Sequence, residues 1–280
     1  MKKIINELFT GERSLFKEKD LIISDSTFKD GESPLKESNN IKLTRCVFGY
    51  KYPLWYAQNI EVNSTLFDDM SRSGIWYTKN INFINNKVIA PKEFRRSSNI
   101  SIVNTEFLNA EETLWSCSKV SIKDSSFKNA DYLLMNSKDI DITNIKVDGN
   151  YFADGGENIK VTNSILNSKD AFWNTKNVYI ENSLIIGEYF GWNSDNVTLV
   201  NCTIKSHQGF CYTKNLKLIN CIVEETDLAF EYSTVEATIN SKVDSIKNPI
   251  SGSIECDSVD KFINNEVDFN KFTLIERKRK

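Results

Sequence analysis

The chain has 280 residues, with 35 lysines and arginines, 38 aspartates and glutamates, and a formal net charge of -3. The two signs are mixed along the chain without a basic stripe, so we expect no nucleic-acid partner. No apolar run approaches the length of a membrane span, and the six cysteines form no Cys-x-x-Cys motif. These features predict a cytoplasmic protein with reduced thiols, no membrane partner, no metal and no cofactor.

The first nineteen residues are expected to form a partial coil that caps the N-terminal end, because the segment from Gly11 to Phe16 aligns with the segment from Gly31 to Lys36. The chain starts with basic residues. The apolar stretch that follows is interrupted by Asn6 and Glu7 before it reaches the length of a signal peptide, so no export signal is expected.

From residue 20 to residue 234 the sequence repeats about eleven times, with a period of 19 to 21 residues. The clearest copies begin at Asn158, Asn177, Asn196 and Asn215, and we number this opening residue as position zero. Self-similarity at so short a period predicts a solenoid, in which each unit packs only on its neighbours. We therefore expect a single domain, with residues 20–234 as its repeating part.

Each unit has three apolar stripes. Positions one and three are apolar around a polar position two, as in Ile159 and Val161, which predicts a short strand with one buried face. Position eight is apolar, as in Phe28, and so is the position five residues before the next zero, as in Leu35. Three stripes per turn predict an all-β, single-stranded, right-handed parallel β-helix with three sheets and about eleven to twelve coils.

Two other solenoids are disfavoured. Leucine-rich repeats have a similar period but place their asparagine three residues after the last strand leucine, and here it follows by two. Left-handed β-helices have a six-residue period, which this sequence lacks.

Asparagine recurs at position five. Stacked amides at the inter-strand spacing of about 4.8 Å can bond up and down a ladder within a turn, so we interpret this row as structural. Aspartate replaces asparagine at Asp25 and Asp124, and Arg45 and Ser64 interrupt the row. The asparagines are Asn85, Asn104, Asn144, Asn163, Asn182, Asn201 and Asn220.

After Thr234 the period fails, and Pro249 and Gly252 intervene, so residues 235–280 are expected to cap the C-terminal end. An uncapped β-helix exposes a sheet edge, which makes an oligomer through the helix ends conceivable. The terminal run from Lys278 to Lys280 is interpreted as a solubilising tail.

All five tryptophans occur four residues before position zero. Charged residues share this row and the row three residues before position zero. Because an unpaired charge inside a β-helix would be costly, we expect both rows to be partly exposed. We interpret them as a strip that binds a ligand. Aromatic rings and amides suit extended sugar chains, which makes a carbohydrate the expected ligand. The candidate ligand-binding residues are Lys36, Trp55, Tyr56, Trp76, Tyr77, Arg95, Arg96, Trp115, Trp173 and Trp192.

A row of acids runs beside the strip, seven or eight residues before position zero. A charge row on a solenoid is commonly a solvated turn, but adjacent coils could also hold two carboxylates about 5 Å apart, as retaining glycosidases do. Asp170 and Glu188 form the first candidate catalytic pair, and Glu112 and Asp131 form the second. His207 is the only histidine and lies in the same row.

Several phrases resemble a bacterial family known only as domain of unknown function 3737. They run from Gly31 to Ser38, Tyr52 to Tyr56, Gly74 to Thr78, Lys169 to Trp173, Gly187 to Trp192 and Leu228 to Ser233. The resemblance spans nearly the whole chain. It implies a fold of the pectin-lyase-like superfamily and no particular activity, because fold does not carry function.

Two classes of function therefore remain open. The strip could bind, and the acids could process, an oligosaccharide or another extended ligand. An enzyme on this fold would be a glycoside hydrolase or a polysaccharide lyase, although the clustered aspartates that hold calcium in such lyases are represented only by Asp68 and Asp69. The alternative is a non-catalytic scaffold whose strip docks another protein.

Overall fold

The computed structural model describes residues 1–277, and the tail from Lys278 to Lys280 lies outside the described residues. The chain divides into an N-terminal unit, Met1–Asp141, and a C-terminal unit, Ile142–Lys280. The chain is an all-β parallel β-solenoid of about 14 turns with almost no helix, so the predicted fold class is confirmed and the predicted eleven to twelve coils are too few.

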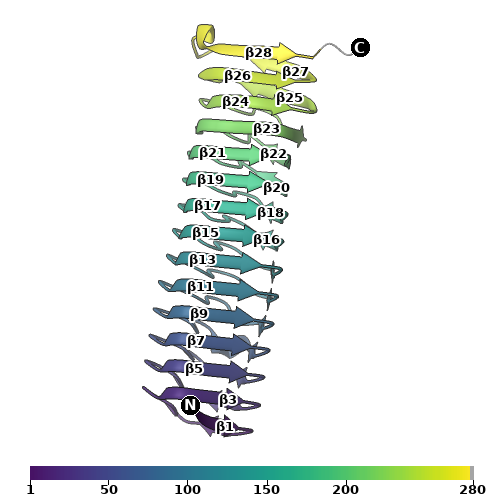
Figure 1. Cartoon of the computed structure of the whole chain (residues 1–280). Coiled ribbons are helices and arrows are strands. Elements are labelled where there is room, and N and C mark those ends of the chain that lie inside the picture. The colour runs from purple at the N-terminus through teal and green to yellow at the C-terminus, as the bar shows by residue number, and fades with distance from the viewer. Residues whose placement is uncertain (278–280) are drawn as a thin grey trace. The chain divides into compact units, whose positions relative to one another are not determined.

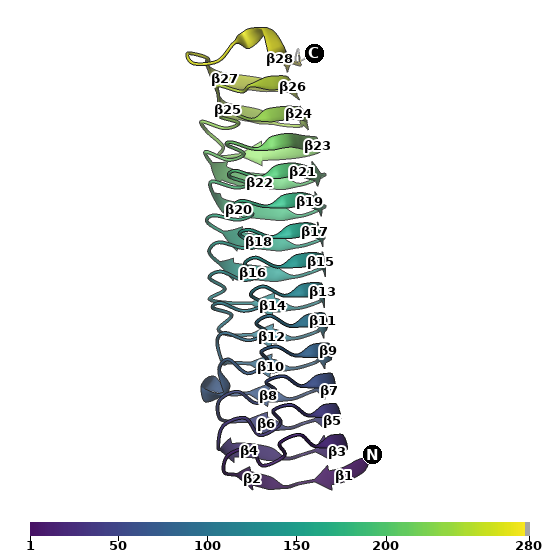
Figure 2. The ribbon, with the colours of Figure 1, turned by 90° about the vertical axis from the view of Figure 1, so that its left-hand side faces the viewer.

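In the N-terminal unit, each coil contributes one strand to a first sheet and one strand to a second sheet (Figures 1 and 2). The strands pair in parallel, and equivalent repeat positions face each other, as Ile41 faces Ile60 and Ile60 faces Ile81. The first sheet contains β1 (Lys2–Ile5), β3 (Lys19–Ser24), β5 (Asn39–Thr44), β7 (Gln58–Asn63), β9 (Lys79–Ile84), β11 (Ser98–Val103) and β13 (Ser118–Lys123). The second sheet contains β2 (Leu8–Thr10), β4 (Thr27–Asp30), β6 (Val47–Phe48), β8 (Leu66–Phe67), β10 (Lys87–Val88), β12 (Glu106–Phe107) and β14 (Ser126–Phe127).

The C-terminal unit repeats this plan. Its first sheet contains β17 (Glu157–Thr162), β19 (Lys176–Glu181), β21 (Asp195–Val200), β23 (Lys214–Glu224), β24 (Thr234–Ile239), β26 (Ser251–Cys256) and β28 (Phe272–Glu276). Its second sheet contains β16 (Lys146–Gly149), β18 (Ile165–Ser168), β20 (Leu184–Glu188), β22 (Thr203–His207) and the end of β23. The division between the units falls within β15 (Lys138–Thr143).

The segment after residue 234 continues the coil beyond the point where the sequence period fails. β24 pairs with β23, β26 with β24 and β28 with β26, all in parallel, and β25 (Lys242–Lys247) pairs with β27 (Ser258–Ile263). Apolar side chains such as Val235 and Ile254 still fill the interior. The opening asparagine is absent from these coils, and for that reason the sequence pattern ended early. A short 3-10 helix, η2 (Phe269–Lys271), precedes β28.

Left-handed backbone explains the asparagine rows better than ladder bonding alone. Position zero, position five and the residue three before the next zero all have positive φ, as at Asn59, Ser64 and Tyr77, with φ of 55°, 51° and 58°. Asparagine tolerates this conformation better than most residues. Each coil therefore turns at three fixed corners.

The predicted asparagine ladder exists, but it is exposed and not enclosed in the turn. At position five, Asn104 donates to Asn85 over 2.7 Å. A second ladder, which we did not predict, runs along position zero, where Asn99 donates to Asn80 and Asn80 donates to Asn59, both over 2.8 Å. Exposed amide bonds of this kind each contribute about 1 kcal/mol or less, so the corner geometry is their main role.

The three predicted apolar stripes are buried. Position eight holds a column of phenylalanines, and the rings of Phe28 and Phe48 stack with centroids 4.7 Å apart. The third stripe, which includes Leu114, is also buried. On that side, isolated bridges join Trp76, Arg95 and Trp115, and another joins Ala229 to Ile246 of the two-stranded sheet β25–β27, so the described residues form no third sheet along all the coils. Left-handed residues at Leu114 and Ser116 interrupt extended backbone there. All six cysteines are free and buried.

One core position of the N-terminal unit holds an acid. Glu93 is 0% exposed, and both of its carboxyl oxygens lack a hydrogen-bond partner. The carboxyl group lies against Gly74 of the preceding coil, where a Cβ atom would come within 2.5 Å of Oε2. Burial raises the pKa of Glu93 well above its ordinary value.

Candidate ligand-binding strip

The five tryptophans are half-buried on the side of the coil between the two sheets that lacks a regular strand. Four of them donate their indole N–H to a backbone carbonyl of the next coil. Trp76 donates to Lys92 and Trp173 to Tyr189, both over 2.8 Å, and Trp55 and Trp115 bond in the same way. The indoles are therefore fixed against the coil and reach the solvent only in part. We call the residues at the two positions four and three before position zero, which include all five tryptophans, the tryptophan strip.

In the N-terminal unit the ring faces of the strip are covered. Trp55 and Trp76 stack with centroids 5.3 Å apart and planes 9° apart. The Arg95 guanidinium lies between the next two rings, 4.5 Å from the centroid of Trp76 and 4.4 Å from that of Trp115. Cation–π contacts of this kind contribute about 0.5 to 2 kcal/mol each, so this stack has a structural role of its own.

The outer margin of the same stack is more accessible. Tyr56 and Arg96 are exposed, and the Tyr56 and Tyr77 rings stack with centroids 4.7 Å apart and planes 7° apart. The Lys36 ammonium lies 5.8 Å from the centre of the Tyr56 ring. The structure thus brings these four predicted residues together as an aromatic and basic margin.

In the C-terminal unit no arginine side chain of the described residues lies between the rings of the strip. Trp173 and Trp192 are tilted by 30° with centroids 5.9 Å apart, and Trp192 and Tyr212 are tilted by 44° with centroids 5.0 Å apart. The two indoles are half-buried like those of the N-terminal unit, so part of each ring remains exposed.

An exposed amide ladder follows the open rings. Asn193 donates to Asn174 over 2.8 Å, and Asn174 donates to Asp154 over 2.9 Å. Each amide retains hydrogen-bonding capacity beyond these bonds, because an amide has two N–H groups and two lone pairs. Hydroxyl groups of a ligand could bind to these positions at the coil spacing of about 4.8 Å.

Sequence reasoning missed Tyr189, which lies edge-on between neighbouring rings. Its ring is 5.8 Å from Trp192 at 82°, 6.5 Å from Trp173 at 75°, and 5.8 Å from His207. A signal was present, because Tyr52 and Tyr189 each occur three residues before a tryptophan of the row. These tyrosines support the indoles from the side.

The first candidate acid pair occupies two different environments. Asp170 is only 4% exposed, whereas the Glu188 side chain is 45% exposed and lies 3.5 Å from the Lys169 ammonium. Burial raises the pKa of Asp170, and the charge of Glu188 raises it further, against the opposing effects of Lys169 and a hydrogen bond from Asn150. A carboxyl group with a raised pKa in the neighbourhood of a second carboxyl group is the combination that glycoside hydrolysis uses.

The second candidate pair is arranged differently. The Glu112 carboxylate binds Arg95 over 2.9 Å and Lys92 over 3.2 Å. Asp131 is exposed, and its backbone carbonyl accepts a hydrogen bond from the Glu112 N–H. Glu112 is therefore held in ion pairs that anchor the arginine of the stack.

A shallow groove of about 390 Å³ lies beside the first pair. His207 contacts Asp227 through Nδ1 and lines the groove together with Lys169, Glu188 and Lys205. Lys205 is itself paired with Glu224 over 3.0 Å. Both signs of charge therefore meet in the groove.

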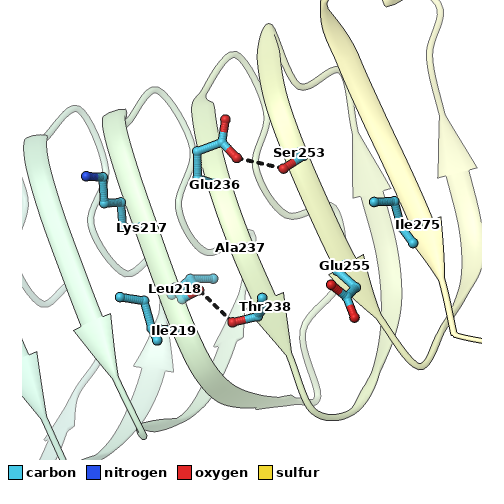
Figure 3. A pocket seen from close by; sticks show the side chains of 9 residues that line it. All are labelled: Lys217, Leu218, Ile219, Glu236, Ala237, Thr238, Ser253, Glu255 and Ile275. Atoms are coloured by element: carbon cyan, nitrogen blue, oxygen red, sulfur yellow. Dashed lines mark hydrogen bonds between the residues drawn. The ribbon is translucent and has the colours of Figure 1, made fainter.

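A second hollow lies on the outward face of the first sheet of the C-terminal unit, at β23, β24, β26 and β28 (Figure 3). Ile219 and Ile275 lie on opposite sides of it, and Glu236 accepts a hydrogen bond from Ser253 over 2.6 Å. It contains no residue that the sequence singled out.

Within residues 1–277, no group of three or more histidine, cysteine, aspartate or glutamate side chains is arranged to hold a metal ion. No helix in that range is long and apolar enough to cross a membrane.

Comparisons with known proteins assign a family but no activity. A family model described as "Protein of unknown function (DUF3737)" matches residues 2–275. No curated protein matches significantly. Two solved structures of PfbA, a surface adhesin of Streptococcus pneumoniae, are similar. One is 12% identical, with a TM-score of 0.34, and the match covers 93% of this chain and 71% of that PfbA chain. The other is 11% identical, with a TM-score of 0.25, and covers 92% and 77%.

Proposed function

Because the chain belongs to the DUF3737 family, whose description assigns no activity, we propose its role from its own surface: the C-terminal unit binds an oligosaccharide along the tryptophan strip. The observation that carries this proposal is the tilted, open arrangement of Trp173, Trp192 and Tyr212 beside the exposed amides of Asn174 and Asn193. Rings supply apolar surface for the C–H groups of a sugar, and amides bind its hydroxyls. The spacing of the coils suits a ligand that is itself extended.

The outer margin of the N-terminal unit supports a second, more basic contact of the same class. Lys36 and Arg96 accompany Tyr56 and Tyr77 there. Acidic sugars would find cations at this margin, whereas Trp55, Trp76, Arg95 and Trp115 have their faces engaged with each other.

The test is binding to an array of neutral and acidic oligosaccharides, followed by calorimetric titration of the strongest neutral hit. We expect Trp192→Ala to weaken the affinity at least tenfold, about 1.4 kcal/mol. Trp76→Ala is the matched control, since it removes a covered ring and should lower the melting temperature without lowering the affinity. Absence of binding to any glycan, or equal weakening by both variants, would overturn the proposal.

A second candidate function is hydrolysis of that ligand, favoured by the raised pKa of Asp170 beside Glu188. Asp170 would donate its proton to the glycosidic oxygen while the Glu188 carboxylate attacks the anomeric carbon. Water would then break the glycosyl–enzyme bond, and Asp170 would take the proton of that water.

We expect Asp170→Asn and Glu188→Gln each to reduce the release of reducing ends at least a hundredfold while the affinity is retained. Glu225→Gln, on the same groove, is the control and should leave turnover unchanged. Because burial raises the pKa of Asp170, wild-type turnover should fall as the pH rises through that pKa. Turnover that survives in Asp170→Asn would exclude this acid, and an unsaturated product would indicate a lyase.

We also propose, from the resemblance of the sequence, that the chain belongs to the pectin-lyase-like superfamily and has a bacterial source. Stacked parallel coils support the former. A cytoplasmic location is supported by Cys202 and Cys221, which occupy the same repeat position in neighbouring coils and are free, buried thiols. Mass analysis of the protein alkylated in denaturant at the moment of cell lysis checks the location, because the six buried thiols then become accessible and six alkylated thiols are expected from a reducing compartment.

A further inference from the structure

The hollow of Figure 3 lies on the outward face of the first sheet of the C-terminal unit, on a different side of the coil from the tryptophan strip. Its volume is about 300 Å³, at the lower end of the range of ligand pockets, so it suits a small molecule. Ile219 of β23 and Ile275 of β28 lie on opposite sides of it, with exposed fractions of 42% and 48%. They provide apolar contact area for a ligand.

A β-bulge shapes the floor of the hollow. The pairing of β23 with β24 shifts register between Leu218 and Cys221, where two residues of β23 face the single residue Thr238. The Thr238 hydroxyl accepts a hydrogen bond from the Asn220 N–H over 3.0 Å and donates one to the Leu218 carbonyl over 3.4 Å. These bonds hold the threonine side chain against the sheet, and Ser253 on β26 is also short. The face is therefore hollowed between the two isoleucines.

Two opposite charges at the hollow are neighbours without being paired. Lys217 and Glu236 are aligned on β23 and β24 and lie on the same outward face. The Glu236 carboxylate accepts a hydrogen bond from Ser253 over 2.6 Å, and Figure 3 shows the Lys217 ammonium pointing the other way. Within residues 1–277, Lys217 has no ion pair. Each group therefore retains its charge for a ligand.

The N-terminal unit contains the same arrangement in a paired form. Lys42 and Glu61 are aligned on β5 and β7, at the same repeat position as Lys217 and Glu236, and their charged groups lie 2.9 Å apart. Lysine and glutamate can thus bind each other directly across neighbouring strands of this sheet. At the hollow, the hydrogen bond from Ser253 keeps the glutamate away from the lysine.

The other acid of the hollow is already neutralised. The Glu255 carboxylate is paired with the Arg277 guanidinium over 2.8 Å. One cation and one anion therefore remain, on strands about 4.8 Å apart. A ligand with a single charge would leave one of them without a partner, whereas a ligand with both charges close together would match them.

We propose that the hollow binds a free α-amino acid with an aliphatic side chain. Its carboxylate binds Lys217, its ammonium group binds Glu236, and its side chain packs on Ile219. An α-amino acid carries both charged groups on one carbon atom, as the neighbouring strands require, whereas the termini of a peptide lie further apart. The hollow is shallow and its charged groups are exposed, so the affinity should be millimolar and should decrease with salt.

The experiment is equilibrium dialysis of the full chain with radiolabelled L-leucine, followed by competition with unlabelled compounds. We expect L-leucine itself to compete best. Leucine amide lacks the carboxylate, 4-methylpentanoate lacks the ammonium group and glycine lacks the aliphatic side chain, so each should require at least a tenfold higher concentration. The absence of saturable leucine binding would overturn the proposal. Equal competition by leucine amide or by 4-methylpentanoate would also overturn it, because the site would then read only one charge.

Variants locate the site, with the fold of each checked by circular dichroism. Glu236→Gln and Lys217→Gln should each weaken leucine binding at least tenfold, and Ile219→Ala at least threefold. The matched control is Glu61→Gln, which removes the paired acid of the N-terminal unit and should bind leucine like wild type. Binding that survives in Glu236→Gln, or that is lost equally in Glu61→Gln, would show that the hollow is not the site.

Discussion

In the Glu93→Gln variant the free energy of unfolding should decrease much less with rising pH than it does in wild type. The Glu93 carboxyl group is enclosed in the core, and both of its oxygens lack hydrogen-bond partners. Its pKa is raised in the folded state and lies near 4.5 in the unfolded chain. The folded protein therefore holds a proton that the unfolded chain releases.

The sign follows from this difference. The contribution of Glu93 to stability is fully present below pH 4.5 and decreases as the pH rises towards the folded pKa, by about 1.4 kcal/mol per pH unit. Glu93→Gln carries no such proton, so its advantage over wild type should grow as the pH rises above 4.5 towards the folded pKa. Urea unfolding at each pH measures the effect. Glu111→Gln, an exposed acid in the same region, is the control and should follow wild type. Parallel profiles for wild type and Glu93→Gln would show that the core acid is not responsible.

The Gly187→Ala variant should lose about 3 kcal/mol of folding free energy or more. A Cβ atom at this position would come within 2.0 Å of the Ser168 carbonyl oxygen and 3.1 Å of the Lys169 Cα. Both atoms belong to the backbone of the preceding coil and cannot rotate away, so the spacing between the coils must increase. Glu188 would move with the backbone, and its ion pair with Lys169 would be disturbed.

Gly49→Ala provides a matched control, because its Cβ would approach no backbone atom more closely than 3.3 Å. We expect this variant to stay within about 1 kcal/mol of wild type in urea unfolding. Equal losses in both variants would mean that glycine serves chain flexibility at these sites and not the close approach of the coils.

The coil was predictable because the same physical demands recur in every unit. Positions one, three and eight must fill a core of constant width, and the corners at position zero and position five require left-handed backbone. These demands repeat at a fixed spacing, so Ile159, Phe28 and Asn104 reveal them without any structure. After residue 234 the core demand persists, as Val235 and Ile254 show, but Thr234 and Ser251 open their strands without asparagine. The prediction ended the coil too early because it relied on the asparagine at position zero, which these strands lack.

The candidate site was predictable only in part. The sequence placed the tryptophans in one row, but the tilt of each ring depends on its neighbour along the stack. In the N-terminal unit the Arg95 guanidinium covers the face of the Trp76 ring, whereas in the C-terminal unit the Tyr212 ring lies at an angle to Trp192. Because the coils differ in length, the sequence analysis treated the positions seven and eight residues before position zero as one row of acids. Asp170 in the first row is buried and Glu188 in the second is not, and this separation is visible only in three dimensions.

The three left-handed corners determine where a coil can change its length. An inserted residue between position zero and position eight would turn every later side chain to the wrong face of a paired strand. The longest unit, the 21 residues from Asn59 to Lys79, instead accommodates its extra residues after β8, as the short 3-10 helix η1 (Asp69–Ser71) capped by Asp68. Loops could therefore be inserted at this bend while the register of both sheets is kept. The bend after the second-sheet strand is thus the place in each coil where surface loops can be added.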